Sequence, residues 1–224
     1  MFLDTEASGL PKKWNQPYSN NQNWPFSVQI AWVIYKSDGS LIKTENHYIA
    51  DNDFQISPSA AKIHGIDRKF LNENGESRKL IMQKLAEDLK TFMPLVAGHF
   101  MEFDYHVASA DFFRAGIANS LEGLPTFCTM LASSCYVKDP SVKYLRLGEL
   151  YSMLFGSRLE KQHDALVDAK ATADCFFELL RRGEITDAKI ESQKVHAAKA
   201  SIAIKWLIIS LILIVFLLLI SLLI

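Results

Sequence analysis

The sequence predicts an α/β domain in which helices flank a mixed sheet, followed by a helix that spans a membrane. Three observations support this prediction: two strands joined by a turn near the start, an alternation of helices and short strands later, and an uncharged apolar stretch at the end. Early strands followed by alternating helices and strands are typical of a sheet with helices on its faces. The expected units are a domain at 1–183, a helical linker at 184–205 and an anchor at 206–224.

The first elements are expected to be a hairpin beside a short strand. Residues 28–35 (VQIAWVIY) are rich in β-branched and aromatic side chains, which favour strands. A turn-forming segment leads into a second strand at 41–50, and the polar segment 11–27 is typical of a loop. The apolar residues before Asp4 resemble a strand that lacks its first residues, which suggests a start upstream of Met1.

Helices alternate with short strands in the remainder of the domain. A helix is expected at 78–93, with a buried face that consists of Leu80, Ile81, Leu85, Leu89 and Phe92. The other expected elements are strands at 95–99 and 126–129 and helices at 103–115, 145–155 and 165–182. A glycine follows each of these last three helices, as is common where a helix ends in left-handed backbone.

A membrane anchor is expected at 206–224, where 19 residues carry no charge. At about 1.5 Å per residue, a helix of this length approaches the ~30 Å hydrocarbon core of a bilayer. A buried core helix is the alternative, but such helices usually keep a polar face. Lys199 and Lys205 precede the stretch, as is common on the cytoplasmic side of a membrane. We therefore expect a single-pass membrane protein whose folded domain lies in the cytoplasm.

Charge and cysteine content limit the classes of function. The net charge is −1, so no overall positive charge attracts nucleic acid, and a ligand rich in phosphate would need local Lys and Arg or bound metal ions. The three cysteines are an odd number, and Cys128 and Cys175 lie in apolar sequence and are expected in the core. The pattern indicates neither a disulfide framework nor a zinc site.

Three segments carry acidic residues that could act together. Asp4 and Glu6 alternate at the end of a strand and therefore point to the same face. Asp104 follows a short strand at the start of a helix, and Asp168 lies in an apolar helix shortly after His163. Buried carboxylates repel one another unless cations lie between them, and their oxygen ligands favour Mg²⁺ or Mn²⁺. Two such ions, about 3.5–4 Å apart, would stabilise phosphoryl displacement, with His163 as the general base for an attacking water.

Each acidic segment by itself has an ordinary explanation. Asp4 and Glu6 could belong to a solvated turn. Asp104 could be an acidic residue that the helix dipole stabilises at the start of a helix. His163 and Asp168 could pair at the surface. The presence of all three segments in this order favours a shared function.

The three segments resemble the motifs of a known enzyme family. FLDTEASGL, GHFMEFDYHV and HDALVDAKATA are similar to the motifs of the DEDDh (DnaQ-like) 3′–5′ exonucleases, which include the epsilon proofreading subunit of bacterial DNA polymerase III. The resemblance extends over residues 1–182 and implies an RNase H-like fold. It implies metal binding by Asp4, Glu6, Asp104 and Asp168, and catalysis by these acids together with His163. It implies substrate binding by Ala7, Ser8, Gly9, Leu10, His64, Ile66 and Phe103.

The function implied by the resemblance is a metal-dependent 3′–5′ exonuclease. Such an enzyme uses two Mg²⁺ or Mn²⁺ ions and releases nucleoside 5′-monophosphates from the 3′ end of a nucleic acid. DNA is favoured over RNA as the substrate, and short RNA is left open. Two alternatives remain: a proofreading subunit bound to a DNA polymerase, and a catalytically silent, membrane-bound nucleic-acid-binding protein. A homodimer is also left open.

A few residues depart from the family pattern or lie outside it. Phe100 stands where the family usually has Asn, which changes the expected contacts to a nucleotide. Trp14 and Trp24 could stack on bases, although an aromatic loop more often packs on its own domain. Lys12 and Lys13 are candidate contacts to phosphates, with a solvated surface as the alternative.

Overall fold

The computed structural model describes residues 1–193, so the expected membrane segment at 206–224 and most of the expected linker lie outside the described residues. Residues Met1–Ile185 form one compact unit, and a second unit begins at Thr186, of which residues 187–193 are described as helical. Within residues 1–193, no helix combines the length and the apolar character that crossing a membrane requires.

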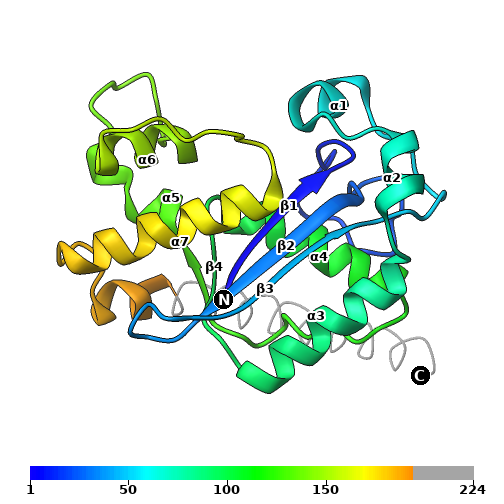
Figure 1. The fold of residues 1–224 in the computed structure, drawn as a ribbon, viewed down its shortest axis with the longest axis horizontal. Helices are drawn as coiled ribbons and strands as arrows, with labels where there is room; N and C mark the ends of the chain where they lie inside the picture. The colour runs from blue at the N-terminus through cyan, green and yellow to red at the C-terminus, as the bar shows by residue number, and fades with distance from the viewer. Residues whose placement is uncertain (194–224) are drawn as a thin grey trace, which may run out of the picture. The chain divides into compact units, whose positions relative to one another are not determined.

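A mixed five-stranded sheet forms the centre of the first unit, with strand order β3-β2-β1-β4-β5 (Figure 1). Its strands are β1 (Phe2–Ala7), β2 (Ser27–Tyr35), β3 (Leu41–Tyr48), β4 (Val96–Gly98) and β5 (Thr126–Cys128). β1 pairs antiparallel with β2 and parallel with β4, and β2 and β3 form the expected antiparallel hairpin. β1 is six residues long and has a neighbour on each side, so it is an ordinary central strand.

Helices of very different lengths connect the strands or follow β5, the last strand. They are α1 (Pro58–His64), α2 (Arg68–Asn74), α3 (Arg78–Phe92), α4 (Met101–Arg114), α5 (Thr129–Ala132), α6 (Leu147–Phe155) and α7 (Ala165–Arg181). Within the expected domain at 1–183, the strands and helices expected from the sequence are confirmed to within two residues at each end. Cys128 and Cys175 are buried, as expected, and none of the three cysteines forms a disulfide within residues 1–193.

The helices α1 and α2 were not expected, although their ends carry recognisable signals. Ser57 caps α1 by accepting a hydrogen bond from a backbone N–H at 3.2 Å, Pro58 lies in the first turn, and Gly65 ends the helix in left-handed conformation. Asp67 caps α2 in the same way at 2.7 Å. Each helix has only seven residues, which is too short for a clear apolar periodicity in the sequence.

Alternate side chains of β1 point to the two faces of the sheet, and each face is covered by helices. Leu3 belongs to the main core, which apolar side chains of α3 and α4 complete. Phe2 lies on the opposite face, where its ring centroid is 5.4 Å from that of Phe176 in α7. Because side chains alternate along a strand, Asp4 and Glu6 share the face of Phe2 and lie on the α7 side.

The buried face of α3 differs from the expected one. Leu80 and Phe92 are 44% and 36% exposed, so both side chains lie outside the core. The buried apolar residues are Ile81, Met82, Leu85, Ala86 and Leu89. This stripe is rotated about the helix axis relative to the expected one, because two overlapping apolar stripes exist and only packing against the sheet selects between them.

Candidate active site

The start of α4 brings Asp104 against β1. Gly98 ends β4, and a Cβ atom there would lie 3.2 Å from the Leu3 carbonyl oxygen, so the absence of a side chain lets α4 begin close to β1. Asp104 is buried, and its Oδ1 accepts hydrogen bonds from the N–H of Thr5 at 2.9 Å and from the Thr5 hydroxyl at 2.8 Å. These two bonds hold the carboxylate beside the strand that carries the first two acids.

The first turn of α7 brings Asp168 to the same region. Asp164 caps this helix by accepting hydrogen bonds from two backbone N–H groups. The small residues Ala169, Ala171 and Ala173 are buried, which allows a close approach of helix and sheet. Asp168 Oδ2 accepts a hydrogen bond from the His163 N–H at 3.0 Å, whereas Oδ1 is buried and has no partner among the described residues.

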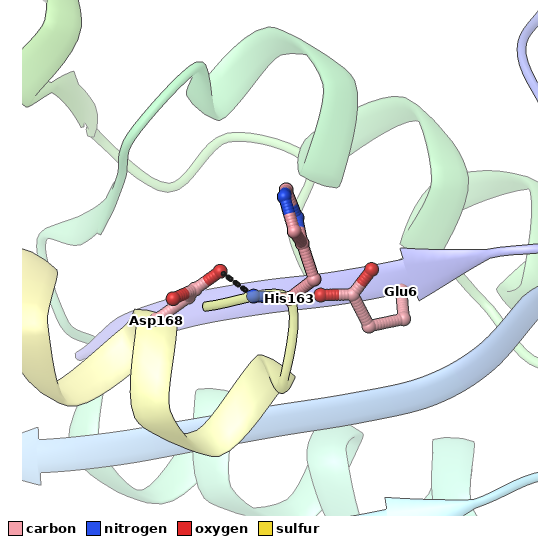
Figure 2. Close-up of side chains that lie close together, drawn as sticks. All are labelled: Glu6, His163 and Asp168. Atoms are coloured by element: carbon pink, nitrogen blue, oxygen red, sulfur yellow. Dashed lines mark hydrogen bonds between the residues drawn. The ribbon is translucent and has the colours of Figure 1, made fainter. Parts of the chain in front are cut away.

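His163 lies on the loop that leads into α7, next to the carboxylates of Glu6 and Asp168. Its side chain is exposed and its backbone has a φ of 67°, which residues other than glycine adopt rarely. Glu6, His163 and Asp168 each offer one ligand atom, and these three atoms lie within 4.8 Å of one another. Figure 2 shows His163 between the two carboxylates, with its backbone nitrogen bonded to Asp168. The structure thus brings together side chains from β1, from the loop before α7 and from α7 itself.

Burial and mutual repulsion raise the carboxyl pKa values in this region. Burial, followed by the charge of Asp168, raises the pKa of Glu6 to about 8. Burial raises the pKa of Asp104 to about 7 and that of Asp168 to about 6, although hydrogen bonds to both act in the opposite direction. For Asp4, burial and the charges of Asp104 and Asp168 raise the pKa well above its usual value. Each pKa is raised because ionisation would add charge to a poorly solvated acidic cluster.

The donor set suits divalent cations. Uncompensated carboxylates in a poorly hydrated position are costly, and bound cations would remove much of that cost. The donors are mainly carboxylate oxygens, which hard divalent ions prefer. Asp168 Oδ1 offers a buried oxygen without a partner among residues 1–193, and the hydrogen bonds from Thr5 to Asp104 use only one of its two oxygens. The residues present therefore fit a metal site.

The expected substrate-binding residues differ in accessibility. Ala7 and Ser8 are buried, and the Ser8 hydroxyl oxygen accepts a hydrogen bond from a backbone N–H at 2.9 Å, so this hydroxyl supports the loop after β1. Gly9 is half-buried, and Leu10 is 80% exposed. Phe103 is half-buried in the first turn of α4. Of these five residues, Leu10 is the most accessible to a ligand.

His64 and Ile66 line a cavity of about 170 Å³ that also reaches His163. The Ile66 N–H donates to His64 Nδ1 at 3.0 Å, which leaves the other ring nitrogen, Nε2, buried and without a partner among the described residues. The other lining residues are Gln29, Tyr48, Gly65, Phe70 and Asp164. The cavity therefore places two of the expected substrate-binding residues next to the expected general base.

Gln29 and Asp164 were not identified from the sequence, although both lie at this cavity. Gln29 Oε1 accepts a hydrogen bond from the N–H of Ala165 at 3.2 Å, and its Nε2 donates to Asn46 at 2.9 Å. Gln29 thereby links β2 and β3 to the first residue of α7. The one sequence signal is a polar residue within the apolar run VQIAWVIY, because buried polar side chains usually have a specific partner.

A comparison with protein families identifies the chain. Its sequence matches the exonuclease family over residues 1–176. The chain belongs to the exonuclease family. The mixed sheet flanked by helices agrees with the RNase H-like fold expected from the sequence. A comparison with curated proteins found no match.

Solved structures of exonuclease I share the fold of this chain. E. coli exonuclease I in complex with a dT13 oligonucleotide is 19% identical, with a TM-score of 0.65, over 80% of this chain and 40% of that one. The zinc ion bound form of an E. coli exonuclease I complex with single-stranded DNA is 18% identical, with a TM-score of 0.66, over 81% and 40%. Exonuclease I from Methylocaldum szegediense is 20% identical, with a TM-score of 0.64, over 84% and 41%. The chain thus spans about 40% of the length of these proteins.

Proposed function

We propose that the chain is a metal-dependent 3′–5′ exonuclease that releases nucleoside 5′-monophosphates from the 3′ end of a nucleic acid. The main support is that acidic side chains from β1, α4 and α7 converge with raised pKa values and without a lysine or arginine partner among residues 1–193. Structural ion pairs have the opposite arrangement, in which each carboxylate has a cation. Strongly raised carboxyl pKa values in such a cluster are typical of a functional site.

Two Mg²⁺ or Mn²⁺ ions would be held by Asp4, Glu6, Asp104 and Asp168. When bound, such ions neutralise charge on the phosphate and on the attacking and leaving oxygens. The zinc ion bound form of E. coli exonuclease I supports divalent cation binding in proteins of this fold. In the present chain, the support is the buried Oδ1 of Asp168, which has no partner among the described residues.

His163 is the proposed general base. It is exposed, and one of its ring nitrogens lies within 4.8 Å of carboxylate oxygens of Glu6 and Asp168. It would take a proton from a water molecule as the water oxygen bonds to the terminal phosphorus. The bond from phosphorus to the 3′ oxygen of the preceding nucleotide breaks, and that oxygen takes up a proton. The terminal nucleotide leaves with its 5′-phosphate.

DNA is the proposed main substrate, with short RNA as the alternative. The support comes from the solved complexes of E. coli exonuclease I with a dT13 oligonucleotide and with single-stranded DNA. The cavity shared by His64, Ile66 and His163 is a suitable location for the terminal nucleoside, because it adjoins the proposed general base.

The test is degradation of matched DNA and RNA oligonucleotides with free or blocked 3′ ends, by the full chain in detergent. We expect Mn²⁺-dependent or Mg²⁺-dependent release of nucleoside 5′-monophosphates from free 3′ ends only. His163→Ala should lower the rate by about 10²–10⁴-fold, as expected for loss of a general base. Equal degradation in EDTA would refute the metal, and equal degradation of blocked ends would refute the polarity.

Residues 206–224 are proposed to tether the catalytic domain to a membrane, with that domain in the cytoplasm. The support is the uncharged apolar stretch and the preceding Lys199 and Lys205. The full chain should remain in the membrane fraction after an alkaline wash, whereas a chain without 206–224 should be soluble and retain nuclease activity. Recovery of the full chain in the soluble fraction would contradict the tether.

A further inference from the structure

Exposed aromatic side chains form a platform beside the acidic cluster. The platform consists of Trp14, from the loop after β1, and of Phe100 and Phe103 at the start of α4. The ring centroids of Trp14 and Phe100 are 5.7 Å apart, and those of Phe100 and Phe103 are 6.1 Å apart with their planes inclined by 17°. Trp14 and Phe100 are 42% and 37% exposed, so aromatic surface remains open to a ligand. Clustered exposed apolar rings often mark a binding surface.

The platform adjoins the proposed catalytic acids. Phe103 immediately precedes Asp104 in α4, and Phe100 lies about one helical turn before Asp104. The Asp104 carboxylate in turn lies beside Thr5, between the two acids of β1. A strand whose 3′ end reaches the acids would therefore have its adjoining nucleotides within reach of the platform.

The loop that carries Trp14 is held in place from both sides. The Asn23 side chain accepts a hydrogen bond from the Lys13 N–H at 2.9 Å and donates one to the Lys13 carbonyl oxygen at 2.8 Å. The Trp24 indole N–H donates to the Gln16 carbonyl oxygen at 2.9 Å, and the buried Trp24 ring lies 6.0 Å from that of Trp14. A ligand that stacks on Trp14 would thus meet a surface that is already formed.

The backbone of Phe100 also suggests a role for its ring. Phe100 has a φ of 72° and a ψ of 46°, and its side chain makes no capping hydrogen bond to α4. Asn or Gly adopts this left-handed conformation at a lower cost than a bulky aromatic residue. The aromatic ring is therefore not required by the local fold.

Positive charge lies next to the platform. Lys12 and Lys13 are exposed in the same loop, and neither forms an ion pair within residues 1–193. Their ammonium groups are free to contact phosphates, while the neighbouring ring of Trp14 contacts a base. Aromatic rings beside basic groups are the usual combination in proteins that bind single-stranded nucleic acid.

We propose that Trp14 and Phe100 stack on unpaired bases next to the 3′ end, so that this surface binds the nucleotides that adjoin the one being removed. The proposal rests on the proposed function for the position of the 3′ end. Stacking requires bases that are not paired, and it tolerates every base because each has an aromatic face. A double-stranded end would have to unpair before it could use the platform.

The first test measures binding of a fluorescein-labelled dT12 to the full chain in detergent with Mn²⁺. A His163→Ala background keeps the oligonucleotide intact during the measurement. Trp14→Ala and Phe100→Ala should each raise the Kd by about fivefold or more, the size expected for the loss of one stacked base. Trp14→Phe should retain most of the affinity. Phe113→Ala is the matched control, because Phe113 is 51% exposed near the other end of α4, and it should bind as the background does.

The second test removes the base instead of the ring. Abasic sites next to the 3′ end should weaken binding to the background protein, and Trp14→Ala should then have little further effect. This non-additivity is specific to a contact between ring and base, because a general structural effect of Trp14→Ala would persist on the abasic strand.

Three outcomes would contradict the proposed stacking. In the first, the Trp14→Ala protein binds dT12 as tightly as the Phe113→Ala protein does. In the others, Trp14→Ala has an undiminished effect on the abasic strand, or the protein binds duplex and single strand equally well. Failure of the nuclease proposal gives a different result. In that case the parent chain with His163 would not hydrolyse the p-nitrophenyl ester of thymidine 5′-monophosphate, a substrate without neighbouring bases, while the binding differences would remain.

Discussion

Two buried aspartates in the same helix, Asp104 and Asp111, have opposite surroundings. Asp111 is fully buried, with its Oδ1 2.7 Å from Arg114 and 3.3 Å from Arg78, and its Oδ2 accepts a hydrogen bond from the Ser27 N–H at 3.0 Å. Asp104, seven residues earlier, is also buried, but it accepts its hydrogen bonds from the uncharged Thr5 and has acidic neighbours. Both positions bring a carboxylate into α4, yet within the described part of the chain arginines lie beside only Asp111.

Asp111 forms ion pairs that support the fold, whereas Asp104 lies where a bound cation would be needed to compensate its charge. Around Asp111, two arginines compensate the charge and also lie over the ring of Phe26, with guanidinium carbons 3.6 Å and 5.0 Å from its centroid. Around Asp104, the uncompensated charge raises the carboxyl pKa to about 7. Substitutions around Asp104 should therefore change activity and metal binding, whereas substitutions around Asp111 should change stability.

The largest expected effect is on activity. Asp104→Asn keeps an oxygen that can accept the hydrogen bonds from Thr5 but removes the charge, so kcat/KM should fall by at least about 100-fold. The unfolding free energy of the metal-free protein should not decrease, because the variant removes a buried charge without a partner. Activity on single-stranded DNA and urea denaturation in EDTA measure the two effects. Activity within threefold of the parent chain would exclude Asp104 from the catalytic site.

Asp111→Asn should have the reverse pattern. The substitution leaves Arg78 and Arg114 without their shared buried partner, which should lower the unfolding free energy by about 3–5 kcal/mol. Protein that remains folded should keep its Mn²⁺ requirement. Urea denaturation at 25 °C measures the loss, and a change below about 1 kcal/mol would mean that the cluster around Asp111 is not a structural ion pair.

The metal-free protein should become less stable as the pH rises. The folded-state pKa values of Glu6, Asp104 and Asp168 are raised to about 8, 7 and 6, whereas carboxyls in an unfolded chain titrate near pH 4. Between about pH 4 and pH 8 the folded state therefore binds more protons, so the unfolding free energy decreases with pH. Thermal unfolding in EDTA across this range measures the trend. Mn²⁺ at about 100 times its Kd should restore roughly 2.7 kcal/mol at pH 8, and a stability that rises with pH would contradict the acidic cluster.

The smallest expected effect concerns the hydrogen bonds that orient Asp104. Thr5→Val keeps the shape of the side chain but removes the bond from the Thr5 hydroxyl to Asp104, at 2.8 Å. The Mn²⁺ concentration needed for half-maximal activity should rise about tenfold, as is typical when a residue that supports a metal ligand is changed. Activity at saturating Mn²⁺ should fall much less. Thr172→Val is a matched control, because Thr172 is also buried but its hydroxyl makes no hydrogen bond within residues 1–193.

Long and strongly patterned elements could be predicted from the sequence. β2 and β3 follow from their β-branched residues and the turn between them, and α7 follows from its apolar periodicity and the glycine that follows it. The short helices α1 and α2 were missed, because seven residues contain too few turns for a periodic signal. On α3, Leu80 was expected inside but is exposed, because the choice between adjacent stripes depends on the shape of the sheet surface.

The sequence by itself determined the residue types at the candidate site and the side of β1 on which Asp4 and Glu6 lie, because side chains alternate along a strand. Only the tertiary structure decided that Asp104 and Asp168 approach that strand, that Gln29 fixes the start of α7, and that Trp14 meets Phe100. Local patterns carry the information for strands and helices, since these depend on neighbours in the chain. Distances between segments about 100 residues apart depend on how the layers pack, which no local pattern contains.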